Sequence, residues 1–91
     1  TEESTLTNIK LNQTSNNPND FNSVLTFNHK VDYDIFTLPH PDRIVIDLKD
    51  CRTAVKSNQI NLGLCPVSKI RIGIQNGYDL RLVYDLPQHI K

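Results

Sequence analysis

Arg-Ile-Val-Ile-Asp-Leu at residues 43–48 returns as Arg-Leu-Val-Tyr-Asp-Leu at residues 81–86. Each copy follows an alternating apolar run and a turn, so a unit of strand, turn and strand occurs twice. Self-similarity of this kind predicts two like hairpins that pack on each other. Neither copy carries a nucleophile beside a base, and the repeat therefore favours a scaffold over an active site.

The turns inside the two units differ in chemistry. The first is Pro39-His40-Pro41-Asp42, where two prolines cannot continue a β-ladder. The second contains Asn76-Gly77, which is the strongest short hairpin signal in the chain because a type I′ turn needs positive φ at both positions. Both turns therefore predict a reversal between two antiparallel strands.

Outside the repeat, the pattern is less regular. Alternation over residues 6–11 and 23–31 predicts two strands, each with one buried face. Residues 49–58 break the alternation, and residues 51–57 within them are compatible with a short helix, whereas residues 59–64 form a plausible strand. The whole chain thus holds seven or eight short strands and at most one helical turn.

Alternating strands give each sheet one apolar face, and two such sheets bury those faces against each other. We therefore predict an all-β fold, a two-sheet β-sandwich built from an internally duplicated strand-turn-strand unit. The predicted inner residues are Ile9, Leu11, Leu25, Phe27, Phe36, Leu38, Ile44, Ile46, Leu48, Ile70, Ile72, Ile74, Leu80, Leu82, Tyr84 and Leu86.

Length and charge exclude several kinds of function. Ninety-one residues predict one domain over residues 1–91, with an ordered core at about 5–90. Ten basic and ten acidic side chains cancel, so no net basic field attracts nucleic acid. No apolar run is long enough for membrane insertion. The sequence shows no secretory leader, so we expect either a cytosolic chain or one trimmed to a mature or expressed fragment.

Five charged residues form the candidate binding site. By the two-residue period, Arg43, Arg71 and Arg81 lie on outward faces, and Asp47 and Asp85 follow two of them at a spacing of four. One interpretation is a set of surface ion pairs across adjacent strands, worth about 0–1 kcal/mol each. The other is a polar sheet surface that binds a ligand, since guanidinium groups suit carboxylates and sugar-peptide acids.

The sequence gives little support for metal binding or catalysis. The three histidines do not pair at a helical spacing, and two cysteines alone cannot complete a zinc site. We expect no catalytic residues, no metal and no cofactor. Thirteen residues separate Cys51 from Cys65, and a disulfide between them would contribute about 3 kcal/mol in an oxidising compartment. Two buried thiols are the alternative.

Three blocks of the sequence resemble the AMIN domain family. Residues 36–48, Phe-Thr-Leu-Pro-His-Pro-Asp-Arg-Ile-Val-Ile-Asp-Leu, are similar to its central signature. Residues 67–73, Val-Ser-Lys-Ile-Arg-Ile-Gly, resemble its second block, and residues 80–86, Leu-Arg-Leu-Val-Tyr-Asp-Leu, resemble its third. Order and rough spacing agree, and the resemblance extends over about residues 5–90.

The resemblance implies a function that the residues alone do not show. AMIN domains are non-catalytic β-sandwich modules of bacterial envelope proteins, most of them periplasmic N-acetylmuramoyl-L-alanine amidases with a separate zinc-dependent catalytic domain. The resemblance implies peptidoglycan as a partner, together with envelope or divisome proteins. It implies a periplasmic location after removal of a signal peptide. The implied role is localisation of the amidase to the septum.

Other readings of the resemblance stay open. AMIN domains also occur in secretins of type IV pilus machines, where a protein partner is expected, and an inert spacer is a third possibility. Amidase-type members often carry a longer insert with a helix between positions equivalent to Leu48 and Val67. Here that stretch is short and holds both cysteines.

Overall fold

The computed structural model describes residues 3–14, 16, 20–63 and 65–87. Within them the chain forms seven strands and one 3₁₀ turn. The elements are β1 (Ser4–Gln13), β2 (Phe21–Phe27), β3 (Tyr33–Leu38), β4 (Arg43–Leu48), β5 (Cys51–Thr53), η1 (Ser57–Gln59), β6 (Lys69–Gln75) and β7 (Asp79–Asp85).

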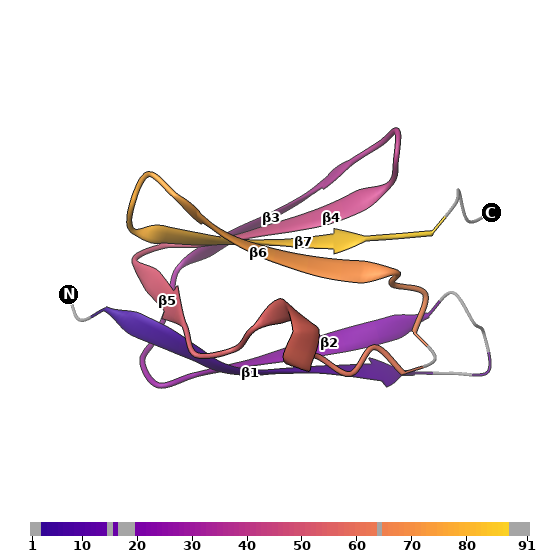
Figure 1. Ribbon diagram of the computed structural model, residues 1–91, viewed down its shortest axis with the longest axis horizontal. Helices are drawn as coiled ribbons and strands as arrows, with labels where there is room; N and C mark the ends of the chain where they lie inside the picture. Colours follow the sequence, from indigo (N-terminus) through magenta and orange to yellow (C-terminus); the bar gives the residue numbers. More distant parts are fainter. Residues whose placement is uncertain (1–2, 15, 17–19, 64, 88–91) are drawn as a thin grey trace.

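The strands form two sheets with the orders β2-β1-β5 and β3-β4-β7-β6, and Figure 1 shows the two sheets stacked on each other. Residues of both sheets make up the buried core. The predicted all-β, two-sheet sandwich is therefore confirmed. All pairs are antiparallel except β1 with β5, which run parallel because a long connection brings the chain back beside β1.

The two repeat copies do not pack face to face as predicted. They are β4 and β7, the central neighbours of one sheet, and they pair so that Arg43 opposes Asp85 and Asp47 opposes Arg81. The hairpins β3–β4 and β6–β7 thus lie side by side. The prediction was wrong because alternation fixes which side chains face the core and leaves the choice of neighbouring strand open.

The core between the sheets is aliphatic, with one buried aromatic ring. Its buried members are Leu6, Ile9, Ile46, Leu48, Cys51, Val67, Ile70, Leu80, Leu82 and Tyr84. The Tyr84 hydroxyl meets the Ser23 hydroxyl of the opposite sheet at 2.6 Å. Burial raises the pKa of this phenol, and the hydrogen bond with Ser23 acts in the opposite direction.

Three residues of the predicted inner set are exposed. Phe36 and Leu38 share the face of Arg43, because the hairpin register places Leu38 opposite Arg43 and Phe36 opposite Val45. Ile74 is 64% exposed near the end of β6. The inward face of β3 is also uncovered, since the second sheet has only three strands and the β3–β4 hairpin rises away from it (Figure 1).

The segment between the repeats also differs from prediction. Residues 51–57 form no α-helix; they begin as β5, and the chain then makes the 3₁₀ turn η1. Residues 60–63 are not a strand, and Leu64 lies outside the described residues. Side chains of this segment still pack against the core, namely Val55, Ile60 and Leu62. They cover it on the side of β6, which η1 contacts.

The Asn76-Gly77 turn is confirmed in its backbone geometry. The φ angles are 57° at Asn76 and 81° at Gly77, and the Tyr78 N–H donates to the Gln75 carbonyl at 3.2 Å. Asparagine and glycine tolerate the left-handed region that such a turn requires. The turn fixes the register of β6 on β7, which in turn fixes which side chains of β6 face outward.

Candidate functional site

The five predicted site residues lie on one surface, the outer face of the four-stranded sheet. We call this surface the arginine face and define it by Arg43, Asp47, Arg71, Arg81 and Asp85, together with Phe36, Leu38, Val45, Gly73 and Val83, which flank them. Alternate positions of β4, β6 and β7 point outward, and the strand register brings the charged residues together.

Arg81 and Asp47 form the first of two bidentate ion pairs on this face. The Arg81 Nε and Nη2 donate to the two Asp47 carboxylate oxygens at 2.7 and 2.9 Å. This hydrogen bonding holds the pKa of Asp47 below its usual range, although partial burial opposes the effect. The Arg81 guanidinium also lies 5.8 Å from the ring centroid of Phe36, within cation–π range.

Arg71 and Asp85 form the second bidentate pair. The Arg71 Nε and Nη2 each donate to an Asp85 carboxylate oxygen at 2.8 Å. In the β-ladder Arg71 stands opposite Val83, so it reaches diagonally along β7 to the carboxylate. The pKa of the Arg71 guanidinium is raised by this hydrogen bond and by the charge of Asp85. The ion-pair interpretation therefore holds for two of the three arginines.

Arg43 behaves differently from the other two. Its Nε donates to the Pro41 carbonyl at 3.1 Å and its Nη2 to the Pro39 carbonyl at 3.3 Å. Its guanidinium thus braces the turn between β3 and β4. Asp85, its cross-strand neighbour, already has both carboxylate oxygens engaged by Arg71.

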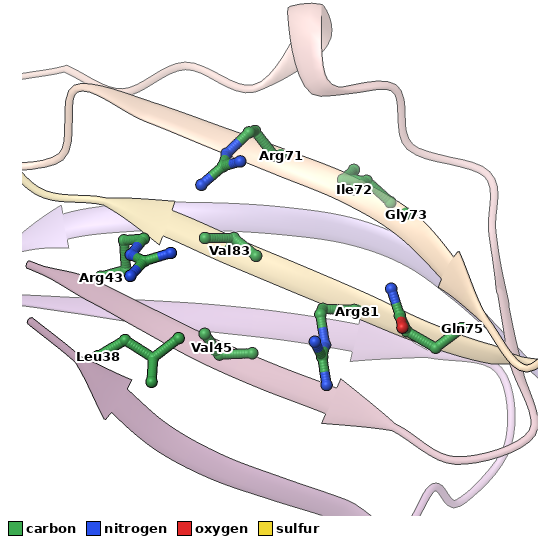
Figure 2. A pocket seen from close by; sticks show the side chains of 9 residues that line it. All are labelled: Leu38, Arg43, Val45, Arg71, Ile72, Gly73, Gln75, Arg81 and Val83. Carbon is green, nitrogen blue, oxygen red and sulfur yellow. The ribbon is translucent and has the colours of Figure 1, made fainter. Parts of the chain in front are cut away.

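A shallow hollow of about 350 Å³ lies over the arginine face. Figure 2 shows its three arginines on three neighbouring strands, with Val45 and Val83 between Arg43 and Arg81. Gly73 contributes to the opening, because a Cβ built there would meet no atom within 4 Å. A second hollow of about 390 Å³ adjoins it and shares Arg43 and Leu38.

The apolar floor of the hollow was missed from the sequence. Val45 is 2% exposed although it points away from the core, because neighbouring side chains cover it on the arginine face. The register that pairs Val45 with Val83 was the missing information. The signal available in the sequence was the interruption of an apolar strand by Gly73, which typically marks a close approach or an opening.

The cysteines take no part in this face. Both are free thiols in this structure. Cys51 is buried in the core, and burial raises the pKa of its thiol, whereas Cys65 is half-buried. Among residues 3–14, 16, 20–63 and 65–87, no group of three or more His, Cys, Asp or Glu side chains is placed to hold a metal ion.

The arginine face offers hydrogen-bond donors, charge and an apolar floor, which is the chemistry of recognition. Comparison with known families gives a match to the family model described as AMIN domain, over residues 8–91. No curated protein matches the chain significantly. In the described part of the chain, no helix has the length and apolar character needed to cross a membrane.

Proposed function

The chain belongs to the AMIN domain family. From this premise we propose that it binds peptidoglycan. We further propose that it localises an N-acetylmuramoyl-L-alanine amidase to the division septum, where the amidase serves daughter-cell separation. AMIN domains are non-catalytic, peptidoglycan-related modules of periplasmic proteins, so the matched residues 8–91 are not themselves an enzyme. Zinc-dependent hydrolysis would then belong to a separate domain of the parent protein.

The observation that best supports wall binding is the arginine face. It gathers three guanidinium groups and two carboxylates over an apolar floor, on a sheet surface that no other element covers in the described residues. Peptidoglycan presents hydroxyl, amide and carboxylate groups along an extended polymer. An open, shallow surface suits such a polymer better than a deep pocket, because the polymer has no small end to insert.

Co-sedimentation with isolated sacculi tests this proposal. We expect the 91-residue chain to pellet with sacculi and the triple variant Arg43→Gln, Arg71→Gln, Arg81→Gln to stay largely in the supernatant. Lys10→Gln is a control for the loss of one positive charge elsewhere, because Lys10 is exposed on the other sheet. A wild-type chain that fails to pellet would contradict the proposal.

Location in the cell tests the amidase context separately. A fluorescent fusion of the parent protein should gather at the septum, and deletion of this domain should spread it around the periplasm. Septal enrichment that survives the deletion would contradict a localising role for the domain.

A protein-binding role in a pilus secretin is the second candidate, and the exposed edge of β3 favours it. Tyr33 and Ile35 are 62% and 57% exposed on this edge strand. An open strand edge with apolar side chains can add a strand from a protein partner. Binding to a secretin-associated protein that Ile35→Lys abolishes, without any binding to sacculi, would favour this candidate.

A further inference from the structure

The three arginines of the arginine face differ in how much of their charge is neutralised nearby. Arg71 and Arg81 each face a bidentate carboxylate, at distances of 2.7–2.9 Å. The hydrogen bonds of Arg43 go to two main-chain carbonyls, which carry no formal charge. A guanidinium remains ionised at any ordinary pH. Arg43 is therefore the centre of positive charge in the hollow.

The strand register shows why Arg43 keeps this charge. Residues directly opposite in an antiparallel pair have Cβ atoms about 5 Å apart, so Asp85 is within easy reach of Arg43. The equivalent pair at the other end of the ladder, Arg81 with Asp47, does form its ion pair. Asp85 instead accepts both of its hydrogen bonds from Arg71 on β6. Arg71 thus prevents Asp85 from neutralising Arg43.

The surroundings of Arg43 suit a small anionic group attached to a larger molecule. Arg43 and Leu38 border both hollows, but the second is also lined by the acidic residue Asp42, so an anionic ligand group at Arg43 is better placed to extend across the first. Val83, which is partly exposed, provides an apolar surface beside it, and the covered Val45 lies next to Val83. A guanidinium binds carboxylates well because its planar N–H donors match the two oxygens.

We propose that Arg43 binds a carboxylate of peptidoglycan in this hollow, and that Arg71 is a positioning residue which keeps Asp85 away from it. This inference rests on the proposed wall-binding function and names the chemical group that is recognised. Peptidoglycan carries carboxylates on its stem peptides, and a lactyl carboxylate appears on the glycan where a stem peptide has been removed. The unmodified N-acetylglucosamine units are neutral.

Competition assays distinguish these sources. Free stem peptides, glycan strands stripped of peptide, and neutral N-acetylglucosamine oligomers would each compete with sacculi for the wild-type chain. Inhibition by free stem peptides assigns the carboxylate to the peptide, and inhibition by stripped glycan assigns it to the lactyl group; either supports the inference. Equal inhibition by the neutral oligomer would overturn it.

Three variants test the arrangement of side chains. Arg43→Gln should weaken binding to sacculi about tenfold, the effect of losing one charge-assisted hydrogen-bonded contact. Arg71→Gln should weaken it similarly, because Asp85 then pairs with Arg43. The double variant Arg71→Gln, Asp85→Asn should restore binding to near the wild-type level, since Arg43 is released again. A merely structural role of Arg71 predicts no such rescue.

Controls keep folding and function separate. Circular dichroism and thermal melting should show folded variants, and Arg43→Lys, which keeps the charge without the planar donors, should bind with intermediate affinity. Lys10→Gln on the other sheet should bind like the wild type. Wild-type strength in Arg43→Gln, or a double variant as weak as Arg71→Gln, would overturn the inference. Failure of the wild type itself to bind sacculi would instead refute the proposed function.

Discussion

Ser23 and Tyr84 lie 61 residues apart in the chain, and their hydroxyl groups meet 2.6 Å apart across the two sheets. Ser23 belongs to β2 in the three-stranded sheet, and Tyr84 to β7 in the four-stranded sheet. The Tyr84 side chain is fully buried, whereas Ser23 is half-buried. This hydrogen bond therefore joins the two sheets within an otherwise aliphatic core, and its two partners differ in their access to water.

That difference predicts unequal effects of removing either hydroxyl. Ser23→Ala leaves the buried Tyr84 hydroxyl without its partner and should cost about 1–3 kcal/mol. Tyr84→Phe leaves a half-exposed serine that water can reach, and should cost only about 0.5–1.5 kcal/mol. Urea unfolding followed by circular dichroism measures both. A larger loss in Tyr84→Phe than in Ser23→Ala would contradict this account of the interface.

The ion pair of Asp47 with Arg81 predicts a dependence of stability on pH. Hydrogen bonding to Arg81 lowers the pKa of Asp47 in the folded chain, whereas the unfolded carboxyl titrates at about 4. The contribution of the pair is thus present above about pH 4 and is lost as the pH falls through the lower folded pKa. Melting temperatures of the wild type and Asp47→Asn should differ most near neutral pH and converge in acid. A difference that stays unchanged as the pH falls well below the unfolded pKa of about 4 would disprove the assignment.

The sequence predicted the fold class and the outward charged residues because both follow from local alternation. The period of two places Arg43, Arg71 and Arg81 on outer surfaces whatever strand lies beside them. The residue pair Asn76-Gly77 likewise predicts its own turn, since that turn depends on the φ preferences of these two residues.

The errors arise where non-local pairing decides the outcome. The β3–β4 register placed Phe36 and Leu38 on the arginine face, and the adjacency of β4 and β7 was not encoded in either strand alone. The same holds for the hydrogen-bond partners. Arg71 donates to Asp85 diagonally across the ladder, and Arg43 donates to carbonyls of its own hairpin turn. These partners depend on how three strands are arranged side by side.

The two free cysteines should differ in reactivity. The thiolate is the reactive form of cysteine, and burial both raises the pKa of Cys51 and shields it, so labelling requires local opening of the core. Cys65 is only half-buried. A thiol reagent should therefore label Cys65 roughly tenfold faster or more in the folded chain. In urea without reductant, both should react, as mass spectrometry will show. No labelling of either cysteine in urea would indicate a disulfide.

The uncovered inner face of β3 gives a direct comparison between cross-strand neighbours. Ile35 and Ile46 lie opposite each other and point to the same side of the sheet, yet Ile35 is 57% exposed and Ile46 only 8%. The three-stranded sheet covers β4 and leaves β3 projecting beyond it. Ile46→Ala should therefore cost about 2–5 kcal/mol, because it leaves a cavity in the core.

Ile35→Ala should change the free energy of unfolding by no more than about 0.5 kcal/mol, because water already surrounds most of the side chain. Chemical denaturation of the two variants under the same conditions measures the contrast. Equal losses would mean that β3 is covered in solution, by a partner or by a second copy of the chain. In that case the loss at Ile35 should depend on protein concentration, since a self-association that buries β3 strengthens as the chain becomes more abundant.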